Sequence, residues 1–205
     1  MHIELTEMLR CLEPHQEGFL VLSTGEMSGR MVRRGLVGCP VCQREYEIVD
    51  GVVYFSGAGS REPGAVGVAD ASAPGSRLPT PDALQALLDL SGPGGYVVLL
   101  GTAARAGAEL APLVGGIHCV GVNAPGDVAE SPVLSLLRSG SVVPLRGSMA
   151  RGVVVGAELA SPAWLAEAAR ILLRGRRLVV AGEDVAAPGV RHLATGQGLW
   201  VGEKQ

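Results

Sequence analysis

The sequence contains few aromatic residues (3%), few charged residues (18%) and a single lysine, Lys204. No apolar run approaches the roughly 20 residues of a membrane-spanning helix, which argues against an integral membrane protein. The first ten residues contain acids and lack the apolar segment of a secretory signal, so we expect a cytoplasmic protein. The net charge is −3, so no overall positive field is available to attract nucleic acid.

Apolar residues occupy 47% of the 205 positions, enough to build the core of one domain or of two small ones. The residues before position 56 carry five arginines against eight acids, and four of the seven aromatic side chains. Seventeen of the 25 residues at 56–80 are Gly, Ala, Ser or Pro, a composition typical of a flexible linker. We therefore predict a small N-terminal domain over residues 1–55, a linker over 56–80 and a second domain over 81–205.

The second domain alternates short apolar runs with segments of helical periodicity. Thr80 and Ser161 are candidate helix N-caps because each precedes a proline at the first helical position, and Gly175 is a candidate helix stop. Buried strands that alternate with helices predict a doubly wound, Rossmann-like α/β sheet. We expect helices over residues 83–90, 103–114, 133–138 and 163–173, and strands over residues 96–100, 117–122, 141–146, 152–157, 177–181, 190–194 and 199–201.

Cys39 and Cys42 form a Cys-x2-Cys turn, which in a chain without a secretory signal favours a metal knuckle over a disulfide. A structural zinc ion needs about four ligands, and Cys11 and His15 are the best candidates for the second pair, with Glu13 as a weaker substitute. The alternative is that the cysteines are ordinary thiols and His15 is a surface residue. A complete shell of protein ligands leaves no position for a catalytic water, so the predicted Zn²⁺ is structural.

The residues after the knuckle carry a family resemblance. Residues 39–52 read Cys-Pro-Val-Cys-Gln-Arg-Glu-Tyr-Glu-Ile-Val-Asp-Gly-Val. This run resembles the end of the small zinc-ribbon family that activates tRNA and release-factor methyltransferases, and the resemblance covers about residues 9–55. In that family a first Cys-x2-Cys supplies the other two ligands, whereas this chain has Cys11-x3-His15. The resemblance implies a zinc ribbon.

A second resemblance lies in the remainder of the chain. The order strand, glycine turn, helix and strand over residues 96–123 resembles the start of class I S-adenosylmethionine-dependent methyltransferases. The resemblance continues through residues 152–159 and 163–180, and it spans about residues 80–202. It implies a methyltransferase-type, Rossmann-like sheet, and in that family the sheet supports methyl transfer from S-adenosylmethionine.

The cofactor loop departs from that family. Gly101 remains, but Leu99 stands at the acidic position, and Ala103 and Arg105 stand at later glycine positions. Side chains there crowd a cofactor, because glycine permits close approach and positive φ. Asn123 replaces the acidic residue that binds the ribose hydroxyls. The resemblance thus implies Gly101 and Asn123 as weak contacts to S-adenosylmethionine, a cofactor that these departures disfavour.

Two more positions bear on activity. The acidic residue expected after the third strand is replaced near Ser148, and Glu158 alone stays acidic in the expected catalytic loop. If each lost contact weakens binding by about 1–2 kcal/mol, cofactor affinity falls about a hundredfold or more. We assign no catalytic residue. The sequence favours a pseudoenzyme, a methyltransferase-like zinc-ribbon protein that holds a protein partner or a multi-subunit complex.

Two other functions stay open. The chain could be an active S-adenosylmethionine-dependent methyltransferase whose activating ribbon is fused in cis. It could also be an RNA-binding adaptor, because arginines cluster at two places, although no aromatic residues are interleaved with them. The clusters consist of Arg30, Arg33 and Arg34, and of Arg174, Arg176 and Arg177.

Overall fold

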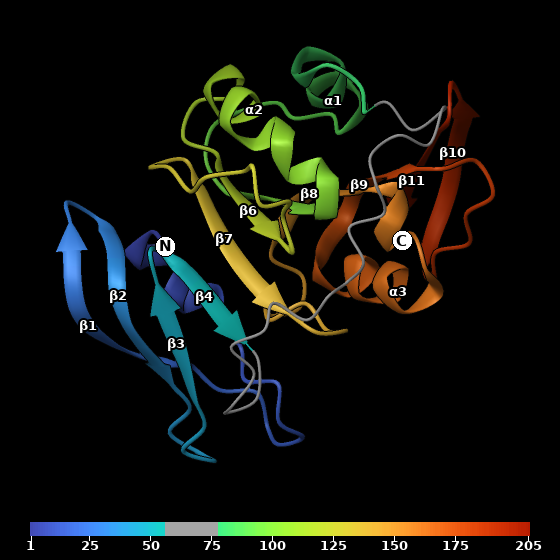
Figure 1. Ribbon diagram of the computed structural model, residues 1–205. Helices are drawn as coiled ribbons and strands as arrows, with labels where there is room; N and C mark the ends of the chain where they lie inside the picture. Colours follow the sequence, from blue (N-terminus) through green and yellow to red (C-terminus); the bar gives the residue numbers. More distant parts are fainter. Residues whose placement is uncertain (56–77) are drawn as a thin grey trace.

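The computed structural model describes residues 1–55 and 78–205 (Figure 1). The linker predicted over residues 56–80 falls almost entirely outside the described residues. Among those that are described, no helix is long and apolar enough to cross a membrane.

The strands form one mixed sheet of eleven strands in the order β1-β2-β3-β4-β7-β6-β5-β8-β9-β11-β10. The central strands β4, β7, β6, β5, β8 and β9 each pair in parallel with the next. Antiparallel pairs lie at the two sides of the sheet: β1, β2, β3 and β4 at one side, and β9, β11 and β10 at the other. The strands are β1 Val21–Ser28, β2 Met31–Gly38, β3 Glu45–Val49, β4 Val52–Phe55, β5 Tyr96–Leu100, β6 His118–Val122, β7 Leu134–Ser139, β8 Ala150–Val155, β9 Leu172–Ala181, β10 Val190–Gly196 and β11 Leu199–Lys204.

Strand β5 lies at the centre of the parallel part, with β6 and β7 on one side and β8 and β9 on the other. The direction of winding therefore reverses at β5, and in such sheets ligands bind beyond the carboxyl ends of the strands at this switch point. The last strand, β11, is antiparallel and lies between β9 and β10. This is the methyltransferase-type, doubly wound α/β sheet that the sequence predicts.

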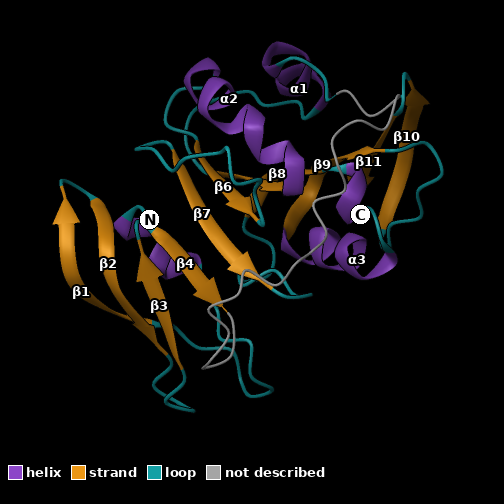
Figure 2. Cartoon of the chain, viewed as in Figure 1, coloured by secondary structure: helices purple, strands orange, loops and turns teal. Residues whose placement is uncertain are grey.

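Helices cover both faces of the sheet. The helices α1 (Pro81–Leu87) and α2 (Gly107–Leu113) pack on one face, together with the 3-10 helix η2 (Gly101–Ala106). The helix α3 (Pro162–Ile171) and the 3-10 helices η1 (Ile3–Met8) and η3 (Ala157–Leu159) pack on the other face. In Figure 2, α1 and α2 lie above the sheet and α3 lies below it. Alternate residues of β5 enter the two cores, which explains why this strand is a continuous apolar run.

Two predicted elements between residues 133 and 146 are wrong. Residues 134–139 form β7, where a helix was expected over residues 133–138, and no regular strand covers residues 141–146. Leu134 and Leu136 enter one core and Leu137 enters the other, so this run is buried on both faces. Periodicity cannot distinguish a short apolar strand of this kind from a buried helix.

The predicted helix stop at Gly175 is also wrong. The helix α3 ends at Ile171, and β9 begins directly at Leu172, whose backbone is already extended. Gly175 lies within β9 with a φ of +68°, in the stretch between Leu172 and Arg177 where pairing with β8 is interrupted. Glycine at position 175 thus permits the positive φ of an irregular strand and does not mark the end of a helix.

Residues 1–55, which we call the N-terminal unit, are joined to the rest of the chain through the sheet and the core. Strand β4 pairs in parallel with β7, from Val52 opposite Leu136 to Phe55 opposite Ser139. Backbone hydrogen bonds also join the segment after η1 to residues 144–146, from Arg10 N to Pro144 O (3.1 Å) and from Arg146 N to Met8 O (2.8 Å). The division of the chain into two domains stays a prediction, with one core running through both.

Candidate functional site

The four predicted metal ligands come from two segments of the N-terminal unit. Cys39 and Cys42 lie in the turn between β2 and β3. The N–H of Cys39 donates to the carbonyl of Arg44 (2.8 Å), and the N–H of Gln43 donates to the carbonyl of Cys39 (2.9 Å). Cys11 and His15 lie in the loop between η1 and β1. The turn and the loop lie next to each other, because the ligand atoms of their four residues form one cluster.

The ligand atoms of Cys11, His15, Cys39 and Cys42 all lie within 4.8 Å of one another. The Sγ atoms of Cys11 and Cys42 are 3.6 Å apart, and His15 Nε2 is 3.3 Å from Cys39 Sγ. With metal–sulfur bonds of about 2.3 Å, two sulfurs of a tetrahedral site are separated by about 3.8 Å. The donor set and its spacing therefore fit a metal ion, and the cluster could hold one.

Surrounding groups orient two of these ligands. His15 Nδ1 lies 2.8 Å from the carbonyl oxygen of Gln16, which can only accept, so Nδ1 carries the proton and Nε2 is free to bind a metal. The hydroxyl of Tyr46 accepts from the N–H of Leu12 (3.2 Å) and lies 3.2 Å from Cys11 Sγ. It is therefore placed to donate to that sulfur, so Tyr46 ties the loop to β3.

The same contacts affect the Cys11 thiol. Burial raises the pKa of this group, but hydrogen bonds donated by the Tyr46 hydroxyl and by the N–H of Glu13, together with those of the neighbouring thiols, outweigh burial and hold the pKa below its usual value. The environment thus favours the thiolate, the form that binds metals.

The segment that follows β5 lies at the switch point. Its residues 101–105 belong to the 3-10 helix η2, and we call them the strand-end loop. Gly101 follows the last residue of β5 and has a φ of +65°, which favours glycine. The carboxylate of Glu158, in the segment after β8, accepts hydrogen bonds from the N–H of Thr102 and from its hydroxyl (2.9 Å to Oγ1). A side chain of the protein itself therefore lies against the predicted cofactor contact Gly101.

Asn123 follows the second strand of the parallel order, β6, as predicted. Its Nδ2 donates to the carbonyl of Ser139 (2.8 Å), and its Oδ1 accepts from the N–H of the same residue (3.0 Å). Both polar atoms of the amide thus hold the end of β7 to the end of β6. The role predicted for Asn123, a contact to ribose hydroxyls, stays a prediction, and Ser139 uses one of the two Nδ2 hydrogens and one of the two Oδ1 lone pairs.

The other predicted departures are distributed over the core and the surface. Leu99 and Ala103 are fully buried in the core under α1 and α2. Arg105 forms a bidentate ion pair with Asp127, with distances of 3.0 Å from Nε and 3.1 Å from one terminal nitrogen. Ser148 lies directly before β8, at the opposite end of the sheet from the switch point, because the third strand is β7 and ends at Ser139. The predicted equivalence of Ser148 is therefore wrong.

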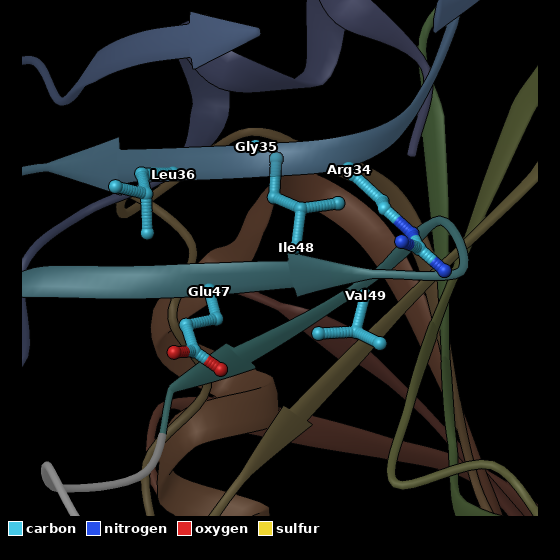
Figure 3. A pocket seen from close by; sticks show the side chains of 6 residues that line it. All are labelled: Arg34, Gly35, Leu36, Glu47, Ile48 and Val49. Carbon is cyan, nitrogen blue, oxygen red and sulfur yellow. The ribbon is translucent and has the colours of Figure 1, made fainter. Parts of the chain in front are cut away.

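The N-terminal unit also has an open hollow of about 390 Å³ on the face of β2 and β3 (Figure 3). Leu36 and Glu47 lie opposite each other in the antiparallel register, so their side chains share this face. The complete lining is Arg34, Gly35, Leu36, Glu47, Ile48 and Val49.

No family model matches the chain, and no curated protein matches it. Solved structures do resemble it at low identity. One is a complex of the Haloferax volcanii Trm112 methyltransferase activator with a putative methyltransferase (23% identity, 49% of this chain, 50% of that chain, TM-score 0.41). Another is a putative methyltransferase of an antibiotic biosynthesis pathway from Anabaena variabilis (18% identity, 52% of this chain, 47% of that chain, TM-score 0.39). A third is a geranyl diphosphate methyltransferase with S-adenosylmethionine (12% identity, 61% of this chain, 84% of that chain, TM-score 0.48).

The match spans about half the length of the first two of these chains. At such identities the resemblance concerns the fold alone. The comparison therefore leaves the function of this chain to be argued from its own residues.

Sequence reasoning missed three features of the site. The hydroxyl of Thr102 and the position of Glu158 against it could not be read from a pattern, because the two residues are 56 positions apart. The Arg105–Asp127 pair was missed for the same reason. Tyr46 did have a signal, since it stands four residues after Cys42 in the run that resembles the ribbon family, but the sequence alone gave no contact between it and Cys11.

Proposed function

We propose that the chain is a non-catalytic, methyltransferase-like protein that holds a structural zinc ion and acts as an interaction subunit of a larger assembly. The observation that carries the proposal is the state of the switch point. The carboxylate of Glu158 fills the space beside Gly101, and both polar atoms of Asn123 are bonded to Ser139. The groups that would bind a nucleoside are thus already bonded within the chain.

Calorimetric titration with S-adenosylmethionine tests the absence of catalysis. We expect no saturable binding at ligand concentrations up to about 1 mM, because binding would have to displace an internal carboxylate and lacks the ribose-binding acid. Micromolar affinity would contradict the proposal. It would favour the alternative function, an active methyltransferase with its ribbon fused in cis, for which the positive φ of Gly101 at the switch point is the supporting observation.

Zinc is the proposed ion because two or three thiolates with one imidazole in tetrahedral spacing are its preferred ligands. Three thiolates and His15 leave no open position, so the ion would stabilise the N-terminal unit, a segment too small to be stable by core packing alone. Metal analysis of the purified chain should find about one zinc ion per molecule. Cys39→Ser should lose the ion, whereas Cys119→Ala, a buried thiol in β6, should retain it.

The N-terminal unit is the proposed partner surface. Among the described residues, seven large apolar side chains are exposed, and five of them belong to this unit. Phe19, Val21 and Val41 are the most exposed, at 62%, 61% and 60%, and the guanidinium of Arg146 lies 4.4 Å from the centre of the Phe19 ring. Exposed apolar side chains gathered on one part of a protein indicate an interaction site.

Affinity purification at native abundance tests the partner proposal. A stable co-purifying protein should be lost with Phe19→Ser and Val41→Ser. It should be retained with the matched controls Leu113→Ser in α2 and Leu193→Ser in β10, which are exposed at 39% and 37% on other elements. Retention in all four variants would contradict the assignment of the surface to the N-terminal unit.

The RNA-binding alternative has less support. Four of the six clustered arginines have carboxylate partners in the chain: Arg30 pairs with Glu4, Arg33 with Glu130, Arg34 with Glu26, and Arg177 with Asp89. Guanidinium groups neutralised in this way contribute little to phosphate binding. Replacing Arg33 and Arg34 by glutamine should therefore leave any weak RNA binding unchanged.

A further inference from the structure

The segment after β8 reaches across the switch point to the strand-end loop. Glu158 lies on η3 and Thr102 on η2, and the two Glu158 oxygens accept the N–H and the hydroxyl of Thr102. We call this contact the latch. It joins the ends of β5 and β8, which are neighbouring parallel strands.

The latch occupies the hollow that two glycines leave. A Cβ atom at Gly156 would lie 2.8 Å from each carboxylate oxygen of Glu158 and 2.5 Å from the Thr102 hydroxyl. A Cβ at Gly101 would collide with the same carboxylate. Because such a close approach needs bare backbone, the two glycines together form a cradle that the Glu158 carboxylate fills.

The strand-end loop is held from its other side as well. Arg105 pairs with Asp127, which lies in the segment after β6. This ion pair lies on the surface, with the two side chains 44% and 61% exposed, and contributes little to stability. The pair does fix the position of the loop. Asp127 after β6 and Glu158 after β8 thus both bind the strand-end loop, at the place where a nucleoside ligand would lie in a sheet of this type.

We propose that Glu158 is an intramolecular occupant of the ligand site at the switch point, an autoinhibitory contact that excludes a nucleoside bearing a carboxylate tail. The inference rests on the proposed absence of cofactor binding, and it gives occupation of the site by Glu158 as the reason for that absence. The backbone N–H and hydroxyl of Thr102 are donors suited to any carboxylate, so a ligand carboxylate and the Glu158 carboxylate compete for them. The internal carboxylate has the advantage because it is tethered to the chain.

Removing the carboxylate should therefore open the site. In Glu158→Ala the cradle of Gly101 and Gly156 is empty and both donors of Thr102 are free, so S-adenosylhomocysteine should bind at least about tenfold more tightly than to the unmodified chain. Glu158→Gln keeps the length and one acceptor but loses the charge, so a smaller gain is expected. Glu109→Ala, an exposed glutamate on α2, is the matched control and should bind like the unmodified chain.

The experiment is a calorimetric titration of the full-length, metal-loaded chain and of these variants with S-adenosylhomocysteine, after circular dichroism has verified that each variant is folded. A gain confined to the Glu158 variants supports the latch. An equal affinity for the unmodified chain and folded Glu158→Ala, including undetectable binding by both, overturns it. If Glu158→Ala does not fold, the comparison is made with Glu158→Gln.

The two proposals fail differently. Micromolar binding by the unmodified chain would refute the proposed function, because the site would then be open without any substitution. Undetectable binding by every folded variant would leave the proposed function standing. It would refute the latch alone, since the lost ribose-binding acid at Asn123 would then be sufficient to exclude the ligand.

Discussion

Glu167 on α3 connects the two parts of the chain, and its removal should destabilise both. Its carboxylate accepts two hydrogen bonds from Arg170, at 2.9 Å and 2.8 Å, and one from the N–H of Val143 at 2.9 Å. Arg10, the neighbour of Cys11 in the chain, has a terminal guanidinium nitrogen 3.5 Å from a Glu167 carboxylate oxygen. Arg170 in turn donates to the carbonyls of Val143 and Leu145. This network holds residues 143–145 and the loop of the metal cluster against α3.

The predicted change is Glu167→Gln. The glutamine keeps the shape and one acceptor, but its amide group faces N–H donors, so at least one partner is left without a hydrogen bond. Breaking a buried ion pair on one side costs about 3–5 kcal/mol, and an unsatisfied polar group costs about 1–3 kcal/mol. Because the Glu167 side chain is 17% exposed and the Arg170 side chain is 27% exposed, solvent screens part of the attraction between them and lowers this cost. We expect the free energy of unfolding to fall by about 2 kcal/mol.

The effect should depend on pH. Burial raises the pKa of Glu167, but the hydrogen bonds and charge of Arg170, the N–H of Val143 and the charge of Arg10 outweigh burial and hold the pKa below its ordinary value of 4.5. A carboxyl with a lowered pKa stabilises the fold above its unfolded pKa, and this contribution is lost as the pH falls through the folded pKa. The difference between the unmodified chain and Glu167→Gln should thus be full at neutral pH and should shrink below about pH 4.5.

Urea unfolding, followed by circular dichroism at pH 7 and in acid, measures both quantities on metal-loaded protein. Arg10→Met is the matched comparison. Its guanidinium is farther from the carboxylate and its Nε is buried without a hydrogen-bond partner, so its removal should cost less than about 1 kcal/mol. A loss below about 0.5 kcal/mol for Glu167→Gln at pH 7 would refute the reasoning, because surface ion pairs typically contribute that little.

Three other predictions follow from single contacts. Burial, with smaller contributions from His2 and the Met1 amino group, lowers the pKa of His118 to about 4. The neutral imidazole is therefore favoured in the fold, and its contribution to the free energy of unfolding is lost as the pH falls from the ordinary pKa of 6.5 towards 4. In urea titrations over that pH range, the free energy of unfolding should fall by up to about 2 kcal/mol more in the unmodified chain than in His118→Gln. Gly101→Ala should reduce stability by about 2 kcal/mol or more through its positive φ and contact with Glu158, whereas Gly115→Ala, with open space around it, should change the melting temperature little. Tyr46→Phe should cost about 1 kcal/mol and speed zinc loss to a chelator relative to Tyr54→Phe; equal rates would show that the Tyr46 hydroxyl does not support the site.

Local signals predicted much of the second half of the chain. The Thr80 hydroxyl accepts the N–H of Ala83 at 3.4 Å, as an N-cap should, and Pro81 follows at the first helical position. Strand β5 was predicted with its observed bounds because a short, β-branched apolar run fits a strand buried on both faces. The C-terminal hairpin of β10 and β11 was found because the turn residues between its strands are a local signal.

The errors cluster where burial, rather than periodicity, decides the structure. Strand β7 contains Ser135, which is fully buried and bonds to the N–H of His2 and to the ring of His118, so this polar residue faces partners from the N-terminal unit and from β6. A serine in an apolar run was thus no indication of a solvent-facing side. The choice between helix and strand depended on β4 and β6, which flank β7 in space and are distant in sequence.

The candidate site divides in the same way. The cluster of Cys11, His15, Cys39 and Cys42, which could hold a metal ion, was predictable because each pair is close in sequence and thiol and imidazole groups at those spacings are typical of metal sites. The latch was not, because it joins Glu158 to a residue that lies 56 positions earlier. The sequence showed which groups a cofactor would lack, whereas the structure shows what lies against Gly101 instead.

Because β4 pairs with β7, the Cys/His cluster of the N-terminal unit is connected to the central sheet. A unit of 55 residues buries too little surface to be very stable, and β7 without β4 would expose an unpaired edge of the central sheet. Pairing of β4 with β7 meets both needs at once, since it extends one sheet and lets Phe55 and Leu137 enter the same core. An ion that fixes the turn of Cys39 and Cys42 to the loop of Cys11 and His15 would therefore also support the edge of the methyltransferase-type sheet. A metal with this role would be structural, as the proposed function requires.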